Sequence, residues 1–234
     1  MISVIIPIYN EEDIIPTYNE TLFPYFESHK IHNRIAEFIF IDDGSTDNSY
    51  KLLQQYNKFN VKILRHEYNF GLGVAIRNGI KAASGDLILT MDADLTYRPD
   101  DATILITHQH TFNYDCVTSS PYKNPGMITS TPLRMILSKT HNYFYSLLLG
   151  KDVTCVSSLF RLYKSNCIKH LTIESENYEV QAEILYKLLF SGKRVKELAI
   201  PLHTREYGIS KLNIQKEMWN SIKMLYKIFK IKYF

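Results

Sequence analysis

The sequence predicts an α/β fold, doubly wound around a mainly parallel sheet with helices on both faces. Two observations predict it: strand-like and helix-like segments alternate along the first hundred residues, and polar residues follow each strand-like segment. Alternation of this kind is typical of parallel sheets, which bind ligands beyond the carboxyl ends of their strands. The apolar run 87–91 ends in Asp92 and Asp94, so we expect both carboxylates at that edge.

The expected strands are short runs rich in β-branched and aromatic residues, bounded by turn-forming residues. Pro7 and the polar residues 9–12 end the first run, and the segment 42–47 ends the second. We expect strands at residues 3–8, 37–41, 61–64, 87–91, 114–119, 158–163 and 195–200.

The expected helices follow from apolar spacing and from capping residues. Pro16 is tolerated in a first helical turn, Thr46 or Asp47 can cap the second helix, and Gly150 ends the fourth. We expect helices at residues 14–29, 50–56, 74–83, 133–149, 178–190 and 216–234. The chain then divides into an α/β domain of residues 1–212 and a C-terminal basic, amphipathic helix in residues 213–234.

Composition excludes several classes of protein. The 234 residues are 45% hydrophobic and 22% charged, which indicates a globular chain, and a net charge of +3 gives no reason to expect a nucleic-acid partner. The spacing of Cys116, Cys155 and Cys167 fits neither a metal site nor a redox motif, so we expect buried thiols in a reducing compartment. The sequence shows no signal peptide and no apolar run of about 18 to 20 residues, so we expect a soluble or peripheral protein.

The Asp92-Ala93-Asp94 segment is the strongest candidate for chemistry. On an extended segment, residues two apart point to the same side, so both carboxylates would face one ligand. Paired hard oxygen ligands suit Mg²⁺ or Mn²⁺ that shares its coordination with phosphates and water. The alternative is a solvated acidic turn after a strand. Gly71-x-Gly73 precedes a helix but lacks the third glycine of a dinucleotide fingerprint.

Four segments in order, residues 4–11, 41–47, 71–73 and 91–94, together resemble the family 2 glycosyltransferases of GT-A fold. The resemblance implies a nucleotide-sugar donor, a divalent metal and an inverting reaction. The second half resembles the polyprenol-phosphate sugar synthases, the class of dolichol-phosphate mannose synthase. The similar segments there are residues 92–99, Arg134-x3-Ser138-x3-Asn142 and residues 205–212.

This chain departs from the pattern of that class at three positions. Thr96 stands where the class has Gln, Pro121 where it often has Arg, and Leu159 where it has Gly. Lys123 is the cation nearest to Pro121. These departures weaken the transfer of the acceptor-phosphate contacts.

The resemblance assigns roles to individual residues. It implies metal binding by Asp92 and Asp94, and catalytic roles for Asp94, Arg134, Arg205 and Lys211. Acceptor binding falls to Arg134, Ser138 and Lys123. Donor binding falls to Pro7, Tyr9, Glu11, Asp42, Asp43, Asp92, Ala93, Arg205 and Lys211. The alternatives are turn formation for Asp42 and Asp43, and a solvated basic loop for Arg205 and Lys211.

We therefore expect transfer of a hexose, mannose in preference to glucose, from a GDP- or UDP-sugar to a polyprenyl phosphate. A lipid phosphate is already an anion and needs cations, and between Arg134 and Arg161 the one acid is Asp152. A hydroxyl acceptor would instead need a general base, for which Glu179 and Glu183 are candidates. An alternative from another class is a nucleotide-sugar-binding scaffold without turnover.

The C-terminal helix suggests a partner. Met218, Ile222, Leu225 and Phe229 form one stripe, with aromatic residues beside it and lysines opposite. This pattern is typical of helices that lie in a membrane interface, although a helix docked on its own domain by an apolar stripe shows it too. With a lipid acceptor, we expect contact with a membrane surface or a membrane protein, at the cytoplasmic face.

Overall fold

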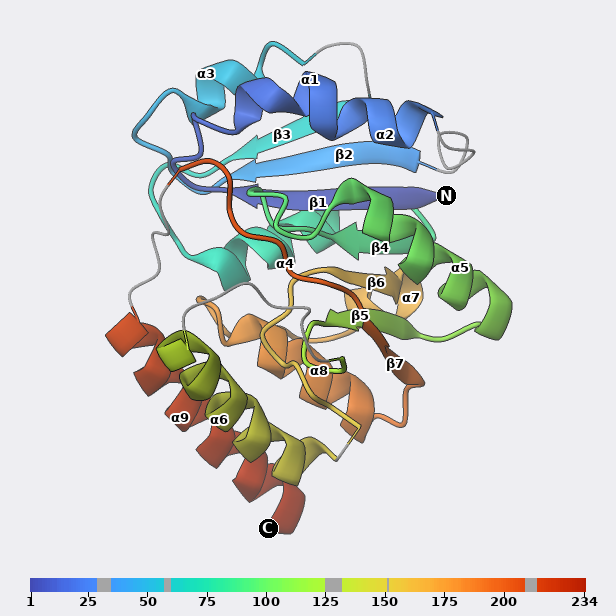
Figure 1. Cartoon of the computed structure of the whole chain (residues 1–234), viewed down its shortest axis with the longest axis vertical. Coiled ribbons are helices and arrows are strands. Elements are labelled where there is room, and N and C mark those ends of the chain that lie inside the picture. The colour runs from blue at the N-terminus through green and yellow to red at the C-terminus, as the bar shows by residue number, and fades with distance from the viewer. Residues whose placement is uncertain (29–34, 57–59, 125–131, 151, 209–213) are drawn as a thin grey trace.

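The structure is a computed structural model that describes all residues except 29–34, 57–59, 125–131, 151 and 209–213. Its described strands form a seven-stranded sheet in the order β3-β2-β1-β4-β6-β5-β7, and Figure 1 shows them stacked in that order from top to bottom. They are β1 (Ile2–Ile8), β2 (Ile35–Asp42), β3 (Val61–Arg65), β4 (Leu87–Thr90), β5 (Cys116–Ser120), β6 (Arg161–Lys164) and β7 (Val195–Ala199). All seven expected strands are confirmed, with shifts at their ends.

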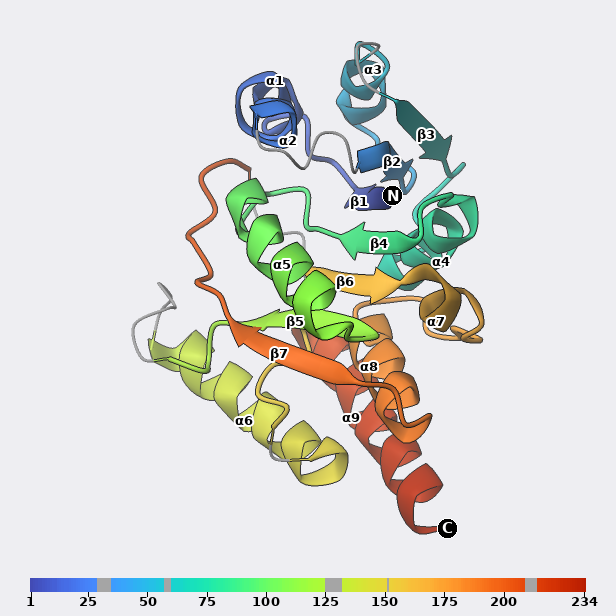
Figure 2. The same cartoon turned by 90° about the vertical axis from the view of Figure 1, so that its right-hand side faces the viewer.

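Helices cover both faces of this sheet, as expected. The longer ones are α4 (Leu72–Ala82), α5 (Ala102–Phe112), α6 (Pro132–Leu149), α8 (Val180–Phe190) and α9 (Ile214–Tyr233). The shorter ones are η1 (Ile15–Thr17), α1 (Tyr18–Thr21), α2 (Phe23–Ser28), α3 (Ser49–Leu53), η3 (Pro99–Asp101) and α7 (Ser165–Lys169). In Figure 2, α1, α2 and α5 lie on one side of the sheet and α4 and α7 on the other.

One helical expectation needs correction, and two helices were not expected. The single helix expected at 14–29 is divided into η1, α1 and α2, with Pro16 inside η1 and Pro24 in the first turn of α2. A proline removes a backbone donor and restricts the residue before it, which explains the interruptions. Neither α5 nor α7 was expected from the sequence. Thr103, Ile104, Ile106 and Thr107 make α5 rich in β-branched residues, which weakens its helical signal.

The sheet is mixed because of one strand. β6 pairs antiparallel with both β4 and β5, whereas the other neighbouring strands pair in parallel. The beginning of β6 therefore lies at the same edge as the carboxyl ends of β1, β2 and β4. Residues just before β6 can thus reach a ligand at that edge.

Successive side chains of the strands point to opposite faces of the sheet and pack into two hydrophobic cores. Val4 and Ile6 of β1 pack with the α1, α2 and α5 side chains, whereas Ile5 packs with those of α4, α7 and α8. This alternation is the period-two pattern of strands buried on both faces. The sheet is therefore fixed between two helical layers, which holds its carboxyl edge in place.

A third core joins α9 to the rest of the chain. Met224 and Ile228 of α9 are buried against Tyr145 of α6 and Leu185 of α8. The helix expected at 216–234 is thus present, and it packs on the domain through Met224 and Ile228, with Leu225 of the expected stripe partly buried beside them. The described part of the chain contains no helix long and apolar enough to cross a membrane.

A buried carboxylate, Glu37, ties three segments together at the opposite edge of the sheet. It accepts hydrogen bonds from the Ser3 hydroxyl at 2.7 Å and the Ser84 backbone at 2.6 Å, and pairs with Lys62 at 2.5 Å. Burial by itself raises the pKa of Glu37, but the Lys62, Ser84 and Ser3 contacts outweigh it and lower that pKa to about 2.

We predict that Glu37→Gln lowers the free energy of unfolding at neutral pH by about 1.5 to 3 kcal/mol, the usual contribution of a hydrogen bond to a charged group. Because the folded-state pKa lies below the ordinary value of 4.5, this stabilisation is present above that value and is lost as pH falls towards 2. Urea unfolding at several pH values measures it. Glu20→Gln, at an exposed position, is the control. Equal stability of Glu37→Gln and wild type would contradict the role.

Candidate active site

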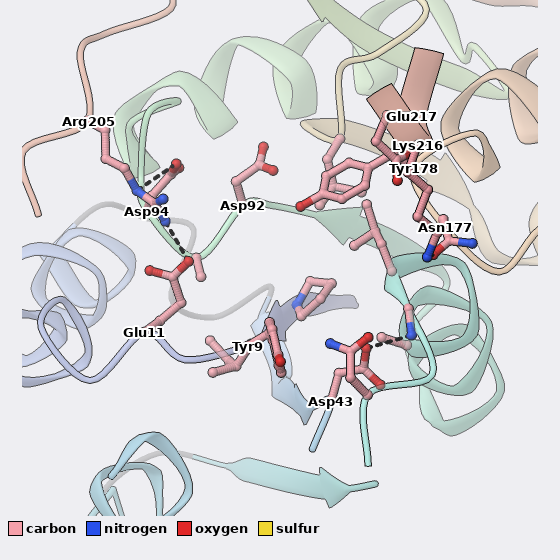
Figure 3. A pocket seen from close by; sticks show the side chains of 18 residues that line it. Tyr9, Glu11, Asp43, Asp92, Asp94, Asn177, Tyr178, Arg205, Lys216 and Glu217 are labelled. Atoms are coloured by element: carbon pink, nitrogen blue, oxygen red, sulfur yellow. Dashed lines mark hydrogen bonds and ion pairs between the residues drawn. The ribbon is translucent and has the colours of Figure 1, made fainter. Parts of the chain in front are cut away.

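A cavity of about 490 Å³ opens at the carboxyl edge of the sheet, within the size range of small-molecule sites. Its walls come from the segments after β1, β2, β3, β4 and β7, from the residues before β6 and α8, and from the first turn of α9 (Figure 3). It is lined by Pro7, Ile8, Tyr9, Glu11, Asp43, Asn69, Gly71, Leu72, Ala75, Asp92, Ala93, Asp94, Leu159, Asn177, Tyr178, Arg205, Lys216 and Glu217. Most of the expected donor-site residues therefore meet in one place.

The Asp92-Ala93-Asp94 segment lies in a turn, because β4 already ends at Thr90. The extended geometry expected for this pair is therefore wrong, although both carboxylates line the cavity. The Tyr18 hydroxyl donates to the Ala93 carbonyl at 2.8 Å, and Thr96 donates to Asp94 Oδ1 through its backbone at 3.1 Å and its hydroxyl at 2.9 Å. These contacts fix the turn and orient Asp94.

Arg205 bridges two of the carboxylates. Its guanidinium lies 2.5 Å from Glu11 Oε1 and 3.3 Å from Asp94 Oδ2, and Figure 3 shows both interactions. Burial and the neighbouring charge of Asp94 raise the pKa of Asp92 well above its usual range, while Arg205 acts in the opposite direction. The site thus disfavours a further negative charge unless a cation accompanies it.

Asp43 lines the cavity, and its carboxylate is held by three donors. The backbone amides of Phe70 and Gly71 donate to it at 3.0 and 2.8 Å, and His66 Nδ1 lies 2.6 Å from Asp43 Oδ1. Asp42 is fully buried, accepts from the Ser45 amide at 3.2 Å and is not among the lining residues. Asp43 therefore lies at the site, whereas the contacts of Asp42 fit the alternative interpretation, in which it stabilises the turn.

The donor set of the cavity fits a divalent metal. Five carboxylates line it, those of Glu11, Asp43, Asp92, Asp94 and Glu217, against the cations Arg205 and Lys216. The described residues contain no cluster of three or more potential ligands that would hold a metal alone. Mg²⁺ and Mn²⁺ commonly bind through one or two carboxylates and complete their shell with substrate phosphates. Asp92 and Asp94 match that arrangement.

The far wall of the cavity was not expected from the sequence. It consists of Asn177 and Tyr178 before α8 and of Lys216 and Glu217 in α9, which Figure 3 shows side by side. Lys216 Nζ donates to Asn177 Oδ1 at 3.2 Å. Lys216 belongs to the lysines expected opposite the apolar stripe of the C-terminal helix, and neither Asn177 nor Tyr178 belongs to a motif. These residues come from segments far from the acidic motifs in the sequence, and no local sequence pattern predicts that they line the cavity.

Ser138 and Lys123 are not among the lining residues of the cavity. The Ser138 hydroxyl pairs with the Tyr122 hydroxyl, and Lys123 Nζ lies 3.9 Å from Glu197 Oε2. Arg134 belongs to α6, but its side chain lies outside the described residues, as does the whole of Lys211. Tyr122 thus links the loop after β5 to α6, and this keeps Ser138 and Lys123 in one region.

Glu183 does not fit the role of general base. Its carboxylate is fully buried and accepts hydrogen bonds from the backbone amides of Glu174 at 3.1 Å and Ser175 at 2.7 Å, and from Lys187 at 2.6 Å. Burial raises its pKa, but Lys187 and the Ser175 contacts outweigh burial and lower it. Neither Glu183 nor Glu179 lines the cavity. A base must reach the acceptor, so we assign Glu183 to holding the 174–175 segment.

Comparison with known proteins gives one family and several relatives. The family described as "Glycosyl transferase family 2" matches residues 3–172. Dodecaprenyl-phosphate galacturonate synthase of Rhizobium johnstonii is 27% identical, covering 99% of this chain and 68% of that protein. UDP-N-acetylglucosamine–dolichyl-phosphate N-acetylglucosaminyltransferase of Methanococcus voltae is 28% identical, covering 90% and 89%. Undecaprenyl-phosphate 4-deoxy-4-formamido-L-arabinose transferase of Yersinia enterocolitica is 28% identical, covering 92% and 63%.

A solved structure shows the same fold. Glucosyl-3-phosphoglycerate synthase of Mycobacterium tuberculosis, in complex with Mn²⁺ and UDP-glucose, superimposes with a TM-score of 0.74. The alignment covers 97% of this chain and 78% of that one at 20% identity. The fold is therefore GT-A, as the sequence predicted.

We predict that Gly73→Ala disrupts the far wall of the cavity. A Cβ at residue 73 would lie 2.1 Å from the Ser175 carbonyl oxygen, and the Gly73 amide donates to the Glu176 carbonyl at 2.7 Å. Because both neighbours are backbone, the 175–177 segment has to move, and we expect a loss of about 1 to 3 kcal/mol in stability together with weaker nucleotide binding.

Thermal unfolding and calorimetric titration with UDP and GDP measure both effects. Gly192→Ala is the control, because that position has a φ of 68° but no atom within 4 Å of an added Cβ. It should cost stability without changing nucleotide binding. Unchanged binding in Gly73→Ala would contradict the role of this contact.

Proposed function

The chain belongs to glycosyl transferase family 2, and from this premise we propose that it transfers a hexose from a nucleotide sugar to a polyprenyl phosphate. The observation that carries the proposal is the cavity in which Asp92, Asp94 and Arg205 meet at the carboxyl edge of the sheet. The names of the three relatives supply the acceptor class. They name galacturonate, N-acetylglucosamine and a formamido-arabinose, so the expected preference for mannose over glucose has no support among these three.

The donor diphosphate is proposed to lie against Asp92, Asp94 and Arg205. A Mg²⁺ or Mn²⁺ ion held by the two aspartates would neutralise charge on the leaving diphosphate. Arg205 can hold a phosphate bidentately once it leaves Glu11 and Asp94, and Lys211 would add a second cation from the same segment. Pro7, Tyr9 and Glu11 line the side where the base and ribose would lie, with Asp43 beyond them.

The proposed reaction needs no general base. A phosphate oxygen of the acceptor forms the new bond to the anomeric carbon while the bond from that carbon to the diphosphate breaks, and its electron pair leaves with the nucleoside diphosphate. Attack from the opposite side inverts the configuration. Arg134, Ser138 and Lys123 are the proposed acceptor-phosphate contacts. The three free cysteines are all buried, which fits a reducing compartment and a reaction at the cytoplasmic face of a membrane.

We predict that Asp94→Asn lowers turnover by about 10²-fold or more, because it removes a charged ligand where charge develops in the transition state. The measurement is transfer from radiolabelled nucleotide sugars to a polyprenyl phosphate, together with the Mn²⁺ dependence of nucleotide binding. Asp100→Asn, at an exposed carboxylate six residues away, is the control and should behave as wild type. Normal turnover of Asp94→Asn, or of the wild type in excess chelator, would exclude the metal role. Donor binding without any transfer would instead favour a non-catalytic scaffold.

A second pair of variants separates the acceptor classes. With a phosphate acceptor, Arg134→Ala should raise the acceptor KM more than the donor KM, because a charge-assisted hydrogen bond of about 1.5 to 3 kcal/mol is lost. Glu183→Gln should keep its rate at saturating substrates but unfold at lower temperature. Lys139→Ala, one turn along α6 at an exposed position, is the control for Arg134. Comparable transfer to the unphosphorylated alcohol would overturn the phosphate acceptor.

A further inference from the structure

Helix α9 has two apolar faces, and only one of them is covered. Ser221, Met224 and Ile228 form the buried face, which packs against α6 and α8. The other face is exposed: Trp219 keeps 60% of its surface accessible and Tyr226 keeps 64%. The exposed face consists of Met218, Trp219, Ile222, Tyr226, Phe229 and Tyr233. At 100° per residue these six side chains fall within an arc of about 100°, so they form one continuous stripe.

Helix α6, which packs against α9, also carries exposed apolar side chains. Among its described side chains these are Tyr143, Phe144 and Leu147. The two helices meet through His141 and Tyr145 of α6, whose side chains contact Ser221 of α9 at 2.6 and 3.1 Å. Tyr145 and Ser221 are both buried, so the two helices pack through these side chains and the exposed side chains of each helix lie outside that contact. Figure 1 shows α6 and α9 running together away from the sheet.

Charge on this surface has one sign. Helix α6 contains no acid, and the one acid of α9, Glu217, lies at the cavity. Lys223 and Lys230 border the apolar stripe, where their ammonium groups lie 5.6 Å from the Trp219 ring and 5.8 Å from the Tyr226 ring. Among the residues that the structure describes, neither lysine has an ion-pair partner.

We propose that the outer face of α6 and α9 docks on a lipid bilayer that contains anionic lipids. Aromatic and aliphatic side chains flanked by lysines match the boundary between acyl chains and headgroups. A second copy of the chain fits this face poorly, because a symmetric contact would bring Lys223 and Lys230 towards the same lysines of the copy. Helix α9 is amphipathic and carries five lysines, so it would lie on the surface and not across it.

The docking face begins at the cavity. Lys216 and Glu217, which line the cavity, occupy the first described turn of the helix whose later turns carry Trp219 and Tyr226 (Figure 3). A bilayer bound along α9 would thus lie next to the cavity. This inference goes beyond the proposed function, and its test needs neither a nucleotide sugar nor a polyprenyl phosphate.

Trp219 is the one tryptophan of the chain, so its fluorescence reports on this face directly. The full chain is titrated with vesicles of phosphatidylcholine and phosphatidylglycerol, and with vesicles of phosphatidylcholine alone. We expect a blue shift and quenching by brominated acyl chains with the anionic vesicles. The affinity should fall as salt is raised, because the lysines contribute electrostatically.

Two double variants test the two components. Ile222→Ser with Tyr226→Ser should weaken vesicle binding about tenfold or more, since it removes apolar surface that would be buried. Lys223→Glu with Lys230→Glu should weaken binding to anionic vesicles about 25-fold or more, at about fivefold for each lysine. The matched controls are Phe112→Ser and Lys51→Glu, at exposed positions of α5 and α3, which should bind as wild type. Sedimentation with vesicles measures all variants, and their melting temperatures confirm folding.

Three results would overturn the proposal. One is a Trp219 spectrum that anionic vesicles leave unchanged. Another is equal loss of binding in the folded control variants. The third is a concentration-dependent dimer that shields Trp219 without lipid and is lost in the Ile222→Ser, Tyr226→Ser variant, which would assign the face to a second copy.

Discussion

The arrangement of the site depends on an excess of negative charge at the carboxyl edge of the sheet. Five carboxylates line a cavity whose described lining supplies two cations, Arg205 and Lys216. Neighbouring carboxylates disfavour each other's ionisation, and burial together with the charge of Asp94 raises the pKa of Asp92. In this structure Arg205 supplies part of the compensation by pairing with Glu11 and Asp94. A ligand that brings a divalent cation would replace this pairing and free the guanidinium for phosphate.

The excess of negative charge also explains why the last part of the chain contributes to the site. Strands β1, β2 and β4 deliver acids to the edge, whereas Arg205 follows β7 and Lys216 lies in α9. The cations thus come from the last part of the chain and the acids mostly from the first. Helix α9 is held against α6 and α8 by Met224 and Ile228, so the packing that covers this core also places Lys216. The division at residue 212 expected from the sequence therefore separates two parts that build one cavity.

Sequence patterns predicted the features that depend on interactions between residues close together in the chain. Signals that act within a few residues, such as the apolar run before Asp92, predicted the seven strands and most of the longer helices, but not α5. The antiparallel direction of β6, the burial of Glu183 and the position of Asn177 depend on contacts between distant segments. The charge spacing of Glu179 and Glu183 suggested a base, but a helical position alone does not reveal which face is buried. The exposed stripe of α9 was visible as a pattern, whereas its second, buried face was not.

The proposed reaction brings two anions to an acidic cavity. The donor diphosphate can be neutralised by a metal and by Arg205, but a phosphate acceptor needs cations of its own. In the described lining only Lys216 is left, and it already donates to Asn177. The proposed acceptor cations Arg134 and Lys123 would supply that charge, and in the sequence they stand within α6 and before it. Helix α6 also belongs to the proposed bilayer surface, which is where a membrane-bound phosphate would arrive.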